Sequence, residues 1–201
     1  MVDLPLAWCN CCRLRWLTRS GNKLRKSTSR TFPQVSATGL PVQVAAVCYR
    51  VRGSSLEFLL VNTSAGKWTF PKGRIVPGLT GSESAALEAL EEAGAEGRIE
   101  ERHFASYVDS KRTLSHDNRS REILIAAYLL EVSAAGAPEE SDRNPTWFTP
   151  TEAQDRLAEQ RVPRYAGQLA TVVDAAVERV VAAQLRLWLR EPEGPGLLLH
   201  N

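Results

Sequence analysis

Apolar residues run unbroken, or alternate with polar ones, over short stretches in the first two thirds of the chain. Residues 42–51 (VQVAAVCYRV) and 56–62 (LEFLLVN) have this pattern and are joined by a Gly-Ser-Ser turn sequence, which predicts a hairpin. Residues 99–108 and 122–132 predict two more strands on either side of a polar, basic loop. Short extended pieces are expected at Trp68-Thr69-Phe70 and Trp147-Phe148.

Two segments have helical character. Residues 82–93 are rich in Ala, Leu and Glu, with Ser82 as a possible N-cap and Gly94 as a possible stop. From Tyr165 to Arg190, apolar residues recur at the spacing of a helix with one buried face, and Pro163 stands just before them. A further helix is expected to start near Thr149-Pro150. Strands and helices alternate irregularly, which predicts an α/β fold with a mixed sheet and helices on both faces.

Charge divides the chain unevenly. Residues 1–40 hold seven Lys/Arg and one Asp, whereas residues 41–201 hold 18 Lys/Arg and 22 Asp/Glu. We expect 1–40 to be a loose basic arm, 41–190 to be the folded domain with its long C-terminal helix, and 191–201 to be a flexible tail. The mildly acidic body argues against a large surface for duplex nucleic acid.

Length and cysteine usage narrow the class of protein. The chain has 201 residues and no apolar run of 18 or more, so no membrane span is expected. Cys9, Cys11 and Cys12 are read as reduced thiols of a cytoplasmic protein, because their spacing does not fit a zinc knuckle. The Arg/Ser-rich arm also fits an organelle transit peptide. Cys48 lies in an apolar strand and is expected in the core.

The end of the C-terminal helix is unusually apolar. Its large side chains are Leu185, Leu187, Trp188 and Leu189. We hypothesise that they pack on the N-terminal arm or on a second subunit, the latter giving a homodimer. A clean monomer by light scattering, with Trp188 fluorescing as if in water, would count against both.

The most prominent chemical feature of the sequence is a group of three carboxylates. Glu88, Glu91 and Glu92 share an arc of about 100° on one side of the 82–93 helix, opposite a set of alanines. Like charges at this spacing repel, and a divalent cation would relieve the repulsion. A plain solvated helix face gives the same pattern.

Two basic loops accompany this helix. The first, 66–78, presents Lys72 and Arg74 around Gly73, and the second, Asp109–Arg121, includes Lys111 and Arg112. Glycine lets a backbone approach an anion closely, so the loops together could clamp a highly phosphorylated ligand. Ordinary solvated turns are the alternative. Glu122 is a weaker candidate for metal or base work, and His103 and His116 are expected at the surface.

In this loop and helix, the sequence resembles the Nudix hydrolase family. That family's box runs Gly, five residues, Glu, seven residues, Arg-Glu-hydrophobic-any-Glu-Glu-any-Gly-hydrophobic. Gly73 opens it here and Ala95 closes it, and the positions that match in between are Glu88, Ala89, Glu91, Glu92 and Gly94. Leu79 and Leu87 stand where the box has Glu and Arg. We hypothesise that this apolar pair replaces a polar support and that the two leucines touch.

The resemblance implies a Nudix α/β/α sandwich with a mixed sheet and hydrolysis of a pyrophosphate linkage. It implies Mg²⁺ or Mn²⁺ held by Glu88, Glu91 and Glu92 with the Gly73 carbonyl, and Glu91 or Glu92 as acceptor of the water's proton. The lead-in to the box is similar to the branch acting on dinucleoside polyphosphates and diphosphoinositol polyphosphates. One alternative is an NTP pyrophosphatase, which base stacking by an aromatic side chain such as Tyr107 would favour. Another is a module that binds a phosphorylated ligand without turnover.

Overall fold

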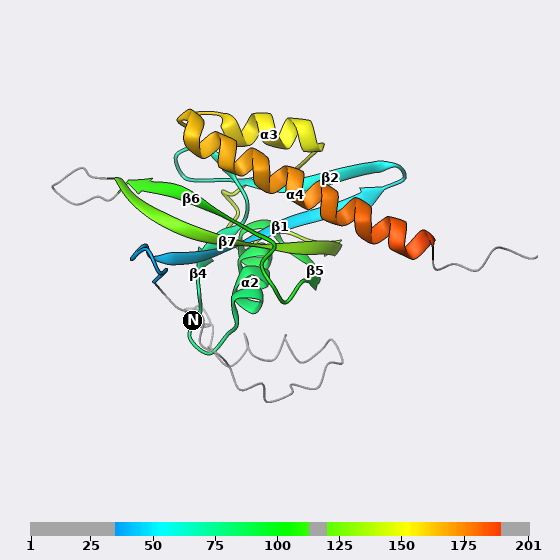
Figure 1. Cartoon of the computed structure of the whole chain (residues 1–201), viewed down its shortest axis with the longest axis horizontal. Helices are drawn as coiled ribbons and strands as arrows, with labels where there is room; N and C mark the ends of the chain where they lie inside the picture. Colours follow the sequence, from blue (N-terminus) through cyan, green and yellow to red (C-terminus); the bar gives the residue numbers. More distant parts are fainter. Residues whose placement is uncertain (1–34, 113–119, 190–201) are drawn as a thin grey trace, which may run out of the picture. The chain divides into compact units, whose positions relative to one another are not determined.

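The computed structural model describes residues 35–112 and 120–189. Most of the predicted arm (1–40) and all of the predicted tail (191–201) lie outside these ranges, so both stay predictions. Within the described part, eight strands form one mixed sheet (Figure 1). The parallel pair is β1 (Val42–Arg52) beside β7 (Ser120–Ala135), and every other strand pairs antiparallel.

The other strands flank this central pair. On the β1 side lie β2 (Ser55–Asn62) and β4 (Lys72–Arg74), followed beyond β2 by β3 (Trp68–Thr69) and β8 (Thr146–Phe148). The hairpin of β1 and β2 is confirmed, with Arg52 opposite Ser55. The strand β4 pairs with the start of β1, where Gly73 lies opposite Val44. This pairing brings the first basic loop to the centre of the sheet.

Two strands share the other edge of β7. They are β5 (Ala95–Ile99) and β6 (Ala105–Arg112), so the prediction of one strand over 99–108 is wrong. Ile99 lies opposite Leu130 and Ala105 opposite Ala127, which leaves residues 100–104 facing only two residues of β7. Residues 100–103 are charged or polar (Glu-Glu-Arg-His), and they bulge out of the ladder as an interruption between the two strands.

Helices cover both faces of the sheet, as predicted (Figure 1). Alternate residues of β1 point to opposite faces. Val47 belongs to the core beneath α3 (Pro150–Ala158) and α4 (Pro163–Trp188), whereas Ala46 and Cys48 belong to the core beneath α2 (Gly81–Ala93). The core placement of Cys48 is therefore confirmed, and the apolar run in β1 is explained by burial on both sides.

The helix ends show how local sequence sets these boundaries. Thr80, not Ser82, caps α2: its hydroxyl accepts the Glu83 amide N–H while the Glu83 carboxylate accepts the Thr80 amide N–H. Ser82 instead lies inside the first turn. Gly94 ends the helix as predicted, with a left-handed backbone at φ 61°. Thr149 caps α3 by the same reciprocal arrangement, and Pro163 is the first residue of α4 rather than the one before it.

The far end of α4 is exposed. Leu187, Trp188 and Leu189 keep 65%, 70% and 66% of their surface accessible. Packing of this end on the arm or on a second subunit stays a prediction. None of the described helices combines the length and apolar character needed to cross a membrane.

Candidate active site

The helix α2 packs its small side chains on the sheet. Ala85, Ala89 and Ala93 are at most 2% exposed and belong to the core on this face. Their size lets the helix backbone approach β4 closely, which brings the glutamates of its other side to the Lys72–Arg74 strand. Glu88 and Glu91 are half-buried, but Glu92 is only 4% exposed. A plain solvated face is therefore excluded for Glu92.

Both carboxylate oxygens of Glu92 have a polar partner. The Lys72 backbone N–H donates to Oε2 at 3.0 Å, and Nη2 of Arg143 forms an ion pair with Oε1 at 2.7 Å. Burial raises the pKa of Glu92, while the Lys72 N–H and the Arg143 charge partly offset that rise. These two contacts tie the end of α2 to β4 and to the loop before β8.

Glu88 lies against the backbone of Gly73. A Cβ built on Gly73 would come within 1.9 Å of Glu88 Oε1, so only glycine leaves room for the carboxylate where it stands. Burial raises the pKa of Glu88 to about 7, and the negative charges of Glu92, Glu91 and Glu140 add to that rise. The charge of Arg143 acts in the opposite direction, so four carboxylates and this guanidinium influence one another here.

Two residues of this site escaped the sequence analysis. Arg143 and Glu140 lie in the loop between β7 and β8, where Nε of Arg143 is 2.5 Å from Glu140 Oε2. The same loop reaches the end of α2, because the Glu140 N–H donates to the carbonyl of Glu91 at 3.0 Å. The charged run EESDR, residues 139–143, was the available signal, but it is also typical of an ordinary surface loop.

The oxygen donors here fit a hard divalent cation only in part. The Glu88 carboxylate and the Gly73 backbone meet in a space that a side chain would fill, and carboxylate oxygens are the ligands that Mg²⁺ prefers. Glu92 is already engaged by Arg143. Among the residues that the structure describes, no three acidic, histidine or cysteine side chains gather closely enough to hold an ion.

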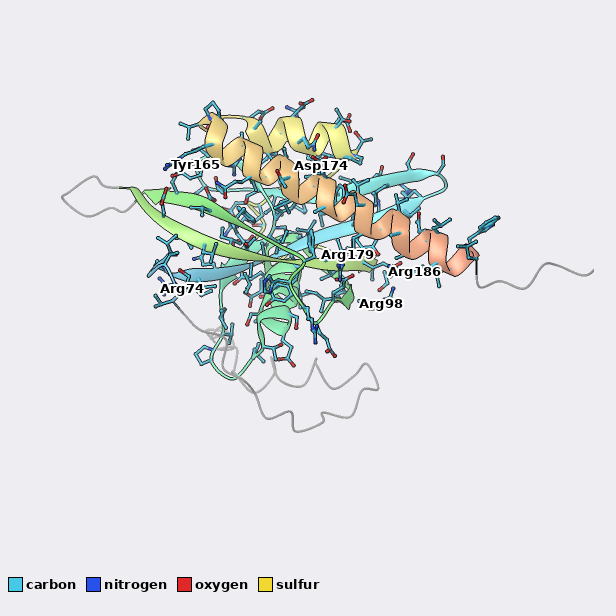
Figure 2. All side chains as sticks on the ribbon, viewed as in Figure 1. Arg74, Arg98, Tyr165, Asp174, Arg179 and Arg186 are labelled. Carbon is cyan, nitrogen blue, oxygen red and sulfur yellow. The ribbon has the colours of Figure 1, made fainter. Side chains whose placement is uncertain are left out.

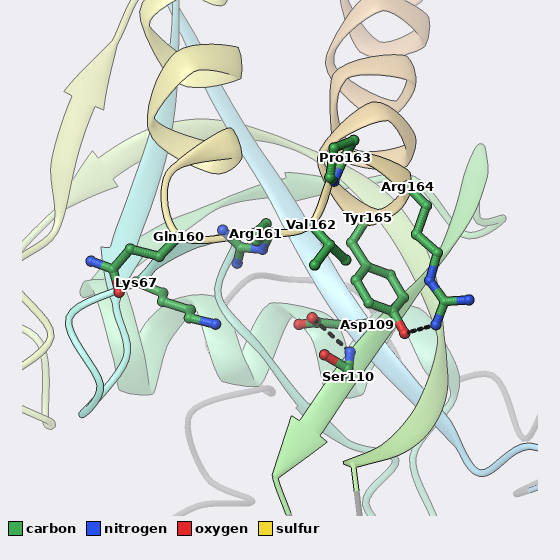
Figure 3. Close-up of a pocket in the computed structure, with 9 residues that line it drawn as sticks. All are labelled: Lys67, Asp109, Ser110, Gln160, Arg161, Val162, Pro163, Arg164 and Tyr165. Atoms are coloured by element: carbon green, nitrogen blue, oxygen red, sulfur yellow. Dashed lines mark hydrogen bonds between the residues drawn. The ribbon is translucent and has the colours of Figure 1, made fainter.

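A cleft of about 610 Å³ opens on the other face of the sheet (Figure 3). The cleft is lined by the residue before β3, by β6, by the turn between α3 and α4 and by the first turn of α4. Its lining residues are Lys67, Asp109, Ser110, Gln160, Arg161, Val162, Pro163, Arg164 and Tyr165. Lys72 connects the cleft to the carboxylates. Its backbone N–H binds Glu92, and its Nζ lies 3.8 Å from Oδ2 of Asp109.

The remaining candidates are placed as follows. Arg74 is exposed at the end of β4, at the opposite end of the sheet from Arg98 (Figure 2). The side chains of Lys111 and Arg112, and the whole of His116, lie outside the described residues. Glu122 accepts hydrogen bonds from Arg164 at 2.6 Å and from the Tyr165 hydroxyl at 2.9 Å. His103 is exposed, as predicted, and its ring meets the edge of Tyr128.

Comparison with known proteins fixes the family. The model of the NUDIX domain matches residues 41–169, well over half of the chain. The chain belongs to the NUDIX family. This confirms the predicted Nudix fold and the expectation of a Nudix pyrophosphohydrolase. The pairing of Leu79 with Leu87, which are both half-buried, stays a prediction.

Solved structures agree with the Nudix fold. A Caenorhabditis elegans Ap4A hydrolase, in a binary complex, is 18% identical, with a TM-score of 0.52 and coverage of 70% of this chain and 98% of that one. The NUDIX domain of Shewanella oneidensis NrtR, complexed with ADP ribose, is 16% identical, with a TM-score of 0.52 and coverage of 83% and 97%. At these identities the likeness concerns the fold.

Replacing Gly73 by Ala tests the contact with Glu88. The new methyl group forces the carboxylate aside, and because this is the end of a flexible side chain the fold should lose little stability. We expect the turnover number to fall about tenfold or more, with Tm changed by only a few degrees, since small misplacements of reacting groups are costly. Gly167→Ala is the control, because a Cβ there meets nothing within 4 Å. Full activity in Gly73→Ala would show that the position of Glu88 does not matter.

Proposed function

We propose that this chain is a Mg²⁺- or Mn²⁺-dependent pyrophosphohydrolase that cleaves a P–O–P linkage in a small, highly phosphorylated substrate. One observation supports this above all: the half-buried Glu88, whose pKa is raised to about 7, lies among Glu91, Glu92 and Glu140. Such an excess of carboxylate charge is costly in a folded protein, and a hard cation neutralises it.

The proposed roles follow from the positions of the donors. Glu88, Glu91 and Glu92, with the Gly73 carbonyl, would hold the ion. When bound, the ion would supply charge neutralisation on the phosphate oxygens and acidify a water. Glu91 or Glu92 would accept the water's proton.

The cleft supports a polyanionic substrate. Lys67, Arg161 and Arg164 line it, with Asp109 as the acid of the lining. Arg164 is paired with Glu122 beside the cleft. Figure 3 shows Lys67 reaching into the cleft toward Asp109. Lys72 lies between this cleft and the carboxylates, so a long phosphate chain could contact both. Together with Lys72, the predicted cations Arg74, Lys111 and Arg112 would extend the clamp. A dinucleoside polyphosphate or a diphosphoinositol polyphosphate fits this charge distribution.

Two alternatives fare differently. Base stacking on Tyr107 would favour an NTP pyrophosphatase. The prediction is wrong for this residue, because the Tyr107 ring is 1% exposed and packs edge-on against Phe70, so a base cannot reach its face. A phosphate-ligand-binding module without turnover is the second candidate function. The ion pair between Arg143 and Glu92 favours it, since a guanidinium already neutralises one of the three carboxylates.

A substrate screen with and without Mg²⁺ tests the proposal. Product formation is measured on dinucleoside polyphosphates, beginning with Ap4A, and on diphosphoinositol polyphosphates and NTPs. The control is the triple variant with Gln at Glu88, Glu91 and Glu92. Mg²⁺-dependent turnover that the triple variant loses is the expected result. Tight binding of the same compounds, measured by calorimetry, without turnover would support the binding module instead.

A further inference from the structure

Arg143 has the firmest attachment of any side chain in this site that sequence reasoning did not assign. Its Nη2 lies 2.7 Å from Glu92 Oε1, its Nε lies 2.5 Å from Glu140 Oε2, and its Nη1 lies 3.5 Å from the carbonyl of Asn62. The side chain is 23% exposed, so its donors are mostly satisfied by the protein. A guanidinium held on three sides is a fixed group rather than a mobile one.

The backbone around Arg143 is fixed as well. Its carbonyl accepts the Asn62 N–H at 2.6 Å, and its own N–H donates to the Glu140 carbonyl at 3.2 Å. The next residue, Asn144, has a left-handed backbone at φ 47°, a conformation that asparagine tolerates better than most residues. The end of β2 and this turn therefore aim Arg143 at the end of α2.

We propose that Arg143 is a positioning residue that holds the Glu92 carboxylate in the orientation in which it also accepts the Lys72 N–H. The Arg143 guanidinium forms an ion pair with one oxygen of this carboxylate at 2.7 Å, and the Lys72 N–H donates to the other at 3.0 Å. Two partners on different oxygens fix both the place and the rotation of the carboxylate. Without the guanidinium, a nearly buried carboxylate beside Glu88 and Glu91 would turn toward water. The role of Glu92 in hydrolysis rests on the proposed function, whereas its orientation by Arg143 does not.

The test combines kinetics with a signal from the Lys72 amide. Arg143→Gln is expected to lower kcat about 10- to 100-fold, with KM changed less than about threefold because Arg143 does not line the cleft. Arg143→Lys should recover part of kcat. In the metal-free protein, Arg143→Gln should also shift the Lys72 amide proton resonance upfield and speed its exchange with solvent. We expect the same direction of change in Glu92→Gln, because a neutral amide oxygen is a weaker acceptor than a carboxylate. Arg98→Gln is the matched control, since Arg98 forms an exposed ion pair with Glu131, also at 2.7 Å.

The outcomes separate the two proposals. An unchanged Lys72 amide in Arg143→Gln overturns the positioning role, whatever the activity. A loss of kcat that Arg98→Gln reproduces also overturns it, because the effect would then be one of general charge. A perturbed Lys72 amide in a protein that hydrolyses no pyrophosphate substrate supports the positioning role and rejects the proposed function.

Discussion

Glu92→Gln is expected to lower kcat at least about 100-fold while the protein still folds. Glutamine keeps an oxygen for the Lys72 N–H, but it loses the negative charge that a cation needs and that Arg143 pairs with. Burial raises the pKa of Glu92 despite Arg143, and Arg143 retains Glu140 as a partner, so removing the charge should change stability by no more than about 1 kcal/mol. Steady-state kinetics at saturating Mg²⁺ and thermal unfolding measure the two effects separately.

The comparison for Glu92→Gln is Glu178→Gln. Glu178 is exposed on α4, far from α2 in the chain. Its replacement by glutamine therefore removes the same charge at a distant position. We expect it to keep full activity and an unchanged Tm. Near-normal turnover in Glu92→Gln would contradict the metal-assisted mechanism. A kcat that falls only in proportion to the unfolded fraction would assign Glu92 to stability alone.

The helices and strands were predictable where the spacing of apolar residues indicates one type of secondary structure. The run in β1 indicated a strand buried on both faces, and the spacing from Tyr165 onward indicated α4. The interruption between β5 and β6 was not predictable in the same way. Apolar residues flank the polar residues 100–103, and only the pairing with β7 shows that they leave the ladder.

The three glutamates were predictable from their spacing, but their environments were not. A helical wheel places Glu92 on the same arc as Glu88 and Glu91, yet Glu92 is the buried one. The loop before β8 decides this, through the Gly136 N–H bond to the Gly94 carbonyl and the ion pair of Arg143. Arg143 is distant in sequence, so no local pattern joins it to Glu92. The guanidinium beside this carboxylate therefore comes from outside the box. Inside the box, Leu87 stands at the position where the family has Arg.

Replacing Glu88 by Gln is expected to abolish most activity and yet stabilise the metal-free protein. The carboxylate loses its charge, so kcat should fall about 100-fold. Stability moves the other way, because the pKa of Glu88 is about 7 in the folded chain against an ordinary value of 4.5. The ionised side chain therefore opposes folding. Allowing for its partial exposure to water, we expect a gain of about 1–3 kcal/mol at pH 8.

The pH dependence identifies the cause of that gain. Below about pH 4.5 the carboxyl is protonated in both the folded and unfolded chain, so Glu88→Gln should match the unaltered protein. Between 4.5 and 7 the unfolded chain releases its proton first, so the folded state loses stability as pH rises, and the penalty is complete above 7. Urea titrations at pH 4, 6 and 8 measure this widening gap. Mg²⁺ should narrow it at pH 8 by stabilising the unaltered chain more than the variant, since an ion that binds only the folded state raises its stability. A gap that is the same at all three pH values would place the effect in packing, and Glu88 would then not be the strained carboxylate on which a divalent cation acts.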